Sequence, residues 1–203
     1  MKLYDAGRAP NPRRVRVFLA EKGLSIETEQ VDLANKQHKS PEFTAINPIQ
    51  RVPVLILDDG TAIAESIAIC RYFEALRPDP PLFGRSALEI AIVEMWQRRI
   101  EMNFLNSIAN VFRHLHPAMA EMEQPQVAQW GEANKPRVIE FLSVLDAQLK
   151  DNVFVAGEHY SVADISGMIA VDFMKVAKLS VPPALKNVAR WYAQVSERPS
   201  AKA

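Results

Sequence analysis

The chain has 203 residues, 48% of them hydrophobic, which is enough to bury the core of one large domain or two small ones. Lys plus Arg and Asp plus Glu both number 24, and this net charge of zero argues against general binding to nucleic acid or an anionic membrane. No apolar stretch approaches the ~18 residues of a membrane span, and residues 1–5 turn polar too early for a signal peptide, so we expect a cytoplasmic protein with a small-molecule partner.

The first part of the chain alternates between strand and helix patterns. Strands are predicted over 2–4 and 26–31, and between them an apolar spacing typical of a helix runs over 13–22. A further helix starts at Ser40, which is a good N-cap residue, with Pro41 at the first helical position.

Residues 47–66 carry the most specific pattern. An apolar run over 54–57 is followed by a tight-turn signal at Asp59-Gly60 and by a second short run, which predicts a β-hairpin. Pro53 enters the first strand, so the residue before it, Val52, is expected to be extended. The backbone N–H and C=O of Val52 are then available to pair with a peptide ligand.

The pair Glu65-Ser66 precedes a run with the apolar spacing of a helix. A carboxylate and a hydroxyl are therefore predicted at a helix N-terminus, an end that binds a ligand carboxylate well. Cys70 lies on the apolar face of that helix, and we interpret it as a packed small hydrophobe and not as a nucleophile.

The second part of the chain shows no strand pattern. Helical patterns run over four segments: 86–116, 126–149, 161–178 and 183–197. We therefore predict an α/β domain over 1–77, a proline-rich linker over 78–85 and an all-helical bundle over 86–203. Ser161 and Asp164 have the spacing of a capping box, which we assign to folding and not to catalysis.

The pattern N-P-x-x-x-V-P-V-L, D-D-G, E-S resembles the glutathione-binding half of cytosolic glutathione transferases. An ordinary hairpin and helix cap would explain each piece separately but not their order. The resemblance implies a thioredoxin-like N-terminal domain followed by a helical domain, and a cis bond before Pro53. It also implies that the Val52 backbone pairs with the cysteinyl unit of glutathione, while Glu65 and Ser66 hold its γ-glutamyl end.

Three basic residues are candidates for the glycine carboxylate of glutathione by the same resemblance. His38 and Lys39 lie in the segment that supplies basic side chains in the family, and Arg51 stands just before Val52. Each of them taken singly is equally well explained as a solvated surface charge.

The family places a Ser, Cys or Tyr hydroxyl or thiol beside the glutathione sulfur, and this chain departs from that pattern. The chain resembles bacterial members of the serine subgroup, but Ala9 stands where the Ser would be. The Tyr of the other subgroup would fall at Asp5, and strand alternation turns Tyr4 the opposite way. Neither aligned position can stabilise a thiolate by O–H donation.

Asn11 remains as the catalytic candidate, because its side-chain amide is a donor. We expect it to act with the N-terminus of a helix beginning near Pro12, whose free N–H groups favour an anion. The alternative is that Asn11 is only the cap of that helix.

The resemblance also suggests where the electrophilic co-substrate binds, in a pocket shaped by Ala9, Phe112, Arg113 and His116. Favourable interaction of cations with a helix C-terminus is an alternative explanation for the basic residues. We expect no metal, because His114 and His116 are two residues apart, and helical metal pairs need a spacing of three or four.

We therefore predict a homodimeric glutathione transferase, a detoxification enzyme that activates glutathione as co-substrate for attack on a small electrophile. Two alternatives stay open: glutathione-dependent disulfide or peroxide reduction, and a glutathione-binding scaffold that lost its chemistry with Ala9. The sequence does not identify the electrophile.

Overall fold

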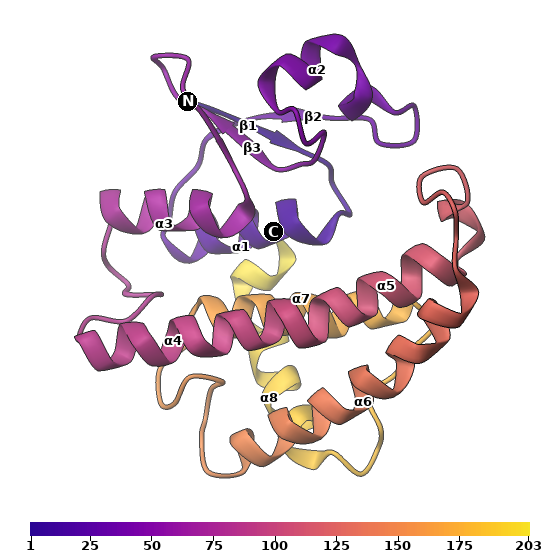
Figure 1. The fold of residues 1–203 in the computed structure, drawn as a ribbon. Coiled ribbons are helices and arrows are strands. Elements are labelled where there is room, and N and C mark those ends of the chain that lie inside the picture. Colours follow the sequence, from indigo (N-terminus) through magenta and orange to yellow (C-terminus); the bar gives the residue numbers. More distant parts are fainter. The chain divides into compact units, whose positions relative to one another are not determined.

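The structure, a computed structural model, describes residues 1–203 and divides into two units (Figure 1). The first unit comprises Met1–Leu82 together with Pro199–Ala203, and the second comprises Phe83–Arg198. None of the helices combines the length and apolarity needed to cross a membrane.

A four-stranded sheet is the centre of the first unit. Its strands are β1 (Lys2–Asp5), β2 (Glu27–Gln30), β3 (Val54–Ile56) and β4 (Ala62–Ala64). Their order in the sheet is β2-β1-β3-β4, with β1 parallel to β2 and antiparallel to β3. The antiparallel pair β3 and β4 is the predicted hairpin, which is thereby confirmed.

Helices cover both faces of this sheet, as the thioredoxin-like prediction requires. α1 (Pro10–Glu21) and α3 (Ser66–Leu76) pack together on one face, and the short α2 (Pro41–Ile46) lies on the other (Figure 1). Phe43 of α2 contacts Tyr4 edge to face, with ring centroids 5.9 Å apart. Tyr4 therefore points toward α2, the direction that strand alternation predicts. Ser40 caps α2 by accepting the N–H of Phe43 at 3.2 Å, as expected.

The start of α1 differs from the prediction. The helix begins at Pro10, not near Pro12, and its N-cap is Ala9, whose side chain makes no cap hydrogen bond. Proline at a first helical position costs nothing, since its fixed φ suits the helix and its missing N–H would be unbonded there. The alternative interpretation of Asn11, as the cap of this helix, is therefore wrong.

Helices alone form the second unit, as predicted. The elements are α4 (Ala87–Arg99), the π-helical segment η2 (Ile100–Leu105), α5 (Asn106–Leu115), the 3₁₀ turn η3 (Pro117–Met119), α6 (Ala128–Lys150), α7 (Val162–Val176) and α8 (Lys186–Ser196). α4, η2 and α5 form one continuous rod, so the single helix predicted over 86–116 contains a π-helical interruption (Figure 1).

α7 is the central helix of the second unit, because most of its residues are buried. Gly167 allows α8 to approach it closely. A Cβ at this position would lie 2.9 Å from Cη2 of the fully buried Trp191. Glycine is therefore required here by packing and not by backbone conformation.

The capping box at the start of α7 forms as predicted, and its carboxylate does more than cap. Asp164 is fully buried and accepts hydrogen bonds from the N–H of Ser161 at 2.9 Å and from its hydroxyl at 3.0 Å. It also accepts from the N–H of Val155 at 2.8 Å and from Nε1 of Trp191 at 2.9 Å. Burial raises the pKa of Asp164 to about 6, against the opposing effect of these hydrogen bonds.

The last residues of the chain belong to the first unit, where Pro199–Lys202 form the 3₁₀ helix η4 and pack against α1. Nη2 of Arg13 donates to the carbonyl of Ala201 at 2.9 Å, and the Ser200 hydroxyl bonds the carboxylate of Glu21. Both partners lie on α1, so this helix is held from two sides, by α3 and by the chain end.

Candidate functional site

The candidate site lies in the first unit where three segments end side by side. In the sheet, Tyr4 of β1 pairs with Val54 of β3, and Val54 pairs with Ala64 of β4. β1 ends at Asp5, β3 begins at Val54 and β4 ends at Ala64, so the chain leaves these three strands at one edge of the sheet, with Val52 two residues outside β3. The β1–α1 loop, the segment before β3 and the N-terminus of α3 therefore meet around Val52.

Val52 lies at a bend just before the first paired residue of β3. The Val52–Pro53 peptide bond is cis, and Val52 precedes the paired residues of β3. The chain before it is fixed by the buried side chain of Asn47, whose amide donates to the carbonyl of Arg51 at 2.9 Å. The side-chain oxygen of Asn47 accepts from the N–H of Ile49 at 3.2 Å, so the turn over 47–51 is held by one side chain.

Glu65 and Ser66 lie at the N-terminus of α3, where the sequence predicts them. Glu65 is the N-cap, is exposed, and has a φ of 68°, a left-handed conformation that is uncommon for a residue with a side chain. Such strain in the backbone is a frequent feature of ligand sites. Ser66 is buried, and its hydroxyl oxygen accepts from Nη1 of Arg14 at 2.7 Å. Because the oxygen acts as the acceptor in this bond, the hydroxyl hydrogen remains available for another acceptor.

Arg14 is a residue of the site that the sequence reasoning missed. Its side chain is buried on the face of α1 that packs against α3. Through its hydrogen bond to Ser66, it brings a positive charge to the N-terminus of α3. One signal was available in the sequence. Arg14 stands four residues before Phe18, on the buried stripe of α1, where an uncompensated cation would be costly.

The three predicted basic residues are electrostatically coupled. His38 is 2% exposed, and its Nδ1 has no hydrogen-bond partner within the protein. Burial is the main cause that lowers the pKa of His38, and the positive charges of Lys39 and Arg51 lower it further. The imidazole is therefore neutral at neutral pH, and Lys39 and Arg51 are both exposed.

The β1–α1 loop contains no hydroxyl between Asp5 and Arg13, so the structure leaves Asn11 as the polar side chain at the start of α1. Pro10 and Pro12 have no N–H, and the N–H of Arg13 bonds the carbonyl of Ala9 at 3.2 Å. The backbone N–H of Asn11 is therefore the one unbonded donor in this first turn. Asn11 is exposed and offers a backbone donor and a side-chain donor on the same residue.

The residues predicted for the co-substrate pocket belong to both units. Ala9 lies in the first unit, and Phe112, Arg113 and His116 lie at the end of α5 in the second. The ring of Phe112 packs on His116 with centroids 5.0 Å apart. Nδ1 of His116 accepts from the N–H of Ala118 at 3.2 Å.

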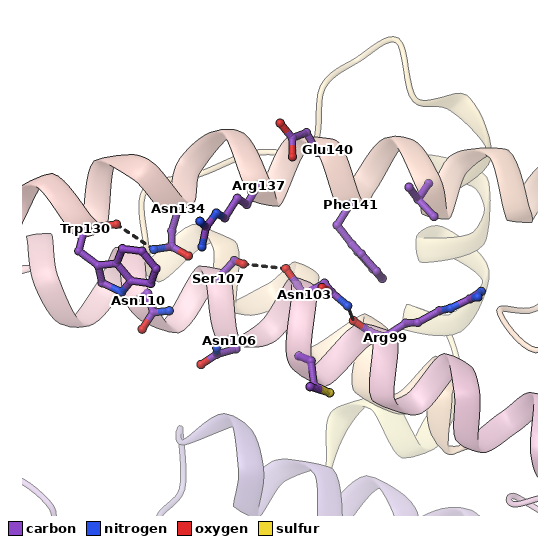
Figure 2. A pocket seen from close by; sticks show the side chains of 12 residues that line it. Arg99, Asn103, Asn106, Ser107, Asn110, Trp130, Asn134, Arg137, Glu140 and Phe141 are labelled. Atoms are coloured by element: carbon purple, nitrogen blue, oxygen red, sulfur yellow. Dashed lines mark hydrogen bonds between the residues drawn. The ribbon is translucent and has the colours of Figure 1, made fainter.

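A groove of about 700 Å³ lies elsewhere in the second unit, between α6 and the η2–α5 segment (Figure 2). Trp130 and Arg137 from α6 face Asn103 and Asn110 from the opposite helix, and the Arg137 guanidinium stacks on the Trp130 ring. Phe112, Arg113 and His116 do not line this groove. In the structure, no cluster of three or more His, Cys, Asp or Glu side chains has the make-up of a metal site.

Two family models match this chain. The model of the glutathione S-transferase N-terminal domain matches residues 1–75, and that of the C-terminal domain matches residues 108–199. A curated relative, glutathione S-transferase 2 of Saccharomyces cerevisiae, is 37% identical over 205 residues, which cover 100% of this chain and 88% of the relative.

Solved structures of glutathione S-transferases superimpose on nearly the whole chain. A glutathione S-transferase domain-containing protein of Marinobacter aquaeolei superimposes with a TM-score of 0.95 at 36% identity, covering 98% of this chain and 99% of that one. A glutathione S-transferase of class Gtt2 from Vibrio parahaemolyticus superimposes with a TM-score of 0.88 at 37% identity, covering 100% and 96%.

Proposed function

We propose that this chain, which belongs to the glutathione S-transferase family, binds glutathione in its first unit and activates the thiol for attack on a small electrophile. The observation that carries the proposal is the meeting of three segments around Val52. The backbone of Val52, a helix end with a buried arginine, and the free donors at the start of α1 offer separate partners for the three parts of glutathione.

The γ-glutamyl end of glutathione carries an amine and a carboxylate. In this proposal the exposed Glu65 carboxylate binds the amine by a charge-assisted hydrogen bond. The Ser66 hydroxyl donates to the γ-glutamyl carboxylate, because its oxygen already accepts from Arg14. The Arg14 charge and the N-terminus of α3 both favour an anion at this position.

The cysteinyl and glycyl parts are assigned to the other two segments. The N–H and C=O of Val52 pair with the cysteinyl backbone as an added strand would. His38, Lys39 and Arg51 bind the glycine carboxylate, with the two cations supplying charge and the neutral His38 supplying an N–H. The unsatisfied Nδ1 of His38 supports this assignment, since buried polar atoms in folded proteins normally have partners.

Asn11 is proposed to hold the thiolate in place of the missing hydroxyl. The thiolate and not the thiol is the nucleophile, and a free cysteine-type thiol has a pKa of about 8.5. One hydrogen bond to a charged group contributes about 1.5–3 kcal/mol, which corresponds to one or two pKa units. The two donors of Asn11 and the end of α1 are therefore sufficient for activation at neutral pH.

The proposal also covers the oligomeric state of the protein and the pocket for the electrophile. We expect a homodimer in the cytoplasm, because closed two-fold assemblies are the commonest oligomers. Sedimentation should then give twice the 22.8 kDa mass of the chain. Ala9, Phe112, Arg113 and His116 remain the residues proposed for the electrophile.

Calorimetric titration with glutathione tests the binding site. Glu65→Gln keeps the size of the side chain and removes its charge, so the affinity should fall about 10- to 150-fold, the equivalent of a hydrogen bond to a charged group. Glu65→Ala should abolish retention on immobilised glutathione. Glu27→Gln, a matched change at an exposed glutamate of β2, should leave the affinity unchanged. Unchanged affinity in both Glu65 variants would reject the assignment.

Titration of thiolate absorbance tests the activation step. Asn11→Ala should raise the pKa of bound glutathione by about one to two units, while Ala9→Ser should leave it equal or lower it. A panel of aryl halides, peroxides and disulfides separates conjugation from reduction. If the wild-type protein binds glutathione without a thiolate shift and turns over none of the panel, the scaffold function replaces the enzymatic one.

A further inference from the structure

A closed polar network surrounds the end of β1, at the entrance to the loop that leads to Asn11 in α1. Asp5 is 1% exposed, and its Oδ1 accepts from the N–H of Ala6 at 2.8 Å and from Nη1 of Arg16 at 2.6 Å. Its Oδ2 accepts from Nε2 of Gln30 at 2.8 Å. Arg16 comes from α1 and Gln30 from the end of β2, so three elements meet on one carboxylate.

The same two partners also hold both backbone groups of Gly7. Oε1 of Gln30 accepts from the Gly7 N–H at 3.0 Å, and Nη2 of Arg16 donates to the Gly7 carbonyl at 2.5 Å. Each partner therefore uses one atom for Asp5 and another for Gly7. The planar fork of arginine and the amide of glutamine are suited to such paired contacts.

Burial does not explain why Gly7 is held in this way. Gly7 and Gln30 are exposed, and the Arg16 side chain is 23% exposed, so water would satisfy the Gly7 backbone groups without any side chain. Ordering exposed side chains costs conformational entropy. The network therefore fixes the position of the loop and contributes little buried surface.

The loop that is fixed leads directly to Asn11. The N–H of Ala9 bonds the carbonyl of Ala6 at 2.7 Å, and Ala9 then caps α1, in which Asn11 is the second residue. A rotating hydroxyl tolerates small displacements of its loop, whereas backbone and amide donors have fixed directions. A site that depends on such donors needs a rigid support, because stabilisation of a charge falls off with misalignment.

We propose that Asp5, Arg16 and Gln30 are positioning residues that hold the β1–α1 loop so that the donors of Asn11 point at the glutathione sulfur. This inference rests on the proposed function. It predicts that loosening the network raises the pKa of the bound thiol and leaves the binding of the rest of glutathione intact.

Gln30→Met tests the inference with little risk to folding, because Gln30 is exposed and methionine has a similar length. The thiol pKa of bound glutathione should rise by about 0.5 to 1 unit, with turnover at neutral pH reduced about 3- to 10-fold. The affinity for S-methylglutathione, which has no thiol to ionise, should stay within a factor of about two, an order-of-magnitude expectation for a surface change. Thr28→Val, on the same strand, should change none of these values.

Arg16→Lys is the second variant, since lysine keeps the charge but cannot reach Asp5 and Gly7 with a planar fork. It should also raise the thiol pKa without weakening S-methylglutathione binding. If the wild-type protein lowers the thiol pKa and both variants lower it equally, the inference is overturned and the proposed function stands. If both variants lose S-methylglutathione binding in parallel, the network is structural and the inference is again overturned. If the wild-type protein shows no thiolate shift, both the proposed activation and this inference fall.

Discussion

Asp5 and Asp164 are both buried carboxylates, but their partners differ in kind. Asp5 is paired with a cation, Arg16, and its other contacts hold an exposed loop. Asp164 is enclosed by neutral donors from Val155, Ser161 and Trp191, which come from three separate parts of the helical unit. The first arrangement fixes a loop beside the candidate site. The second ties together the interior of a domain.

This comparison teaches how to separate residues that serve a site from those that serve the fold. Removing a carboxylate that is surrounded by buried donors should strongly lower the stability of the protein. Removing an exposed member of the other network should change chemistry at the site without a large effect on stability.

Asp164→Ala should lower the free energy of unfolding by about 4 kcal/mol or more. The substitution leaves the N–H groups of Val155 and Ser161 and the indole N–H of Trp191 buried without an acceptor, at about 1–3 kcal/mol each. Urea unfolding followed by tryptophan fluorescence measures the change. Gln30→Met should change the same quantity by about 1 kcal/mol, the usual net contribution of one hydrogen bond, because Arg16 still pairs with Asp5. Equal effects in the two variants would contradict the comparison.

The stability of the protein should contain a contribution that depends on the ionisation of Asp164. Because its pKa is raised from 3.8 to about 6 in the folded state, the folded protein binds this proton more tightly than the unfolded chain. The contribution is fully present below about pH 4 and is lost as the pH rises to about 6. Since a difference of one pKa unit corresponds to about 1.36 kcal/mol, the loss should be about 3 kcal/mol in total. The side chain in Asp164→Asn cannot ionise. The difference in free energy of unfolding between this variant and the wild type should therefore change between about pH 4 and 6 and stay constant at higher pH.

Asn47→Ala tests a residue that should support both the fold and the candidate site. Its buried amide holds the turn before Val52 by two hydrogen bonds, so its loss should cost about 2 kcal/mol of stability. The same loss frees the peptide edge, and glutathione affinity should fall as well. Calorimetry and urea unfolding of one preparation measure both effects. If the variant loses stability but binds glutathione with unchanged affinity, Asn47 supports the fold and not the binding site.

Ser40→Ala should lower the free energy of unfolding by about 1 kcal/mol, which is the usual contribution of an N-cap. The variant removes the oxygen that accepts the Phe43 N–H at the start of α2. Ser40→Gly should recover most of the loss, since glycine is tolerated at an N-cap. An Ala variant as stable as the wild type would show that α2 is held by the packing of Phe43 alone.

Local features of this protein were determined by the sequence itself. The hairpin of β3 and β4, the cap at Ser40 and the capping box at Ser161 all depend on residues within a few positions of one another. The same holds for the placement of Glu65 and Ser66 at the start of α3. Hydrophobic period, turn residues and capping residues act over that short range, so they can be recognised without knowledge of the fold.

The start of α1 shows the limit of such local reasoning. Pro10 and Pro12 both fit the first turn of a helix, and the sequence does not choose between them. The folded chain begins the helix at Pro10, which moves Asn11 from the cap into the first turn. The pair of prolines then leaves the N–H of Asn11 as the one unbonded backbone donor there, a consequence that only the helix boundary reveals.

The tertiary structure alone decided which distant polar groups meet. Arg14 reaches Ser66, Trp191 reaches Asp164, and Gln30 reaches Asp5, across sequence separations of 52, 27 and 25 residues. Each contact exists because helices and strands pack in one arrangement, and a buried polar group must then find its partner among whatever elements that arrangement brings near. Sequence periodicity carries no information about such partners, since it describes one element at a time.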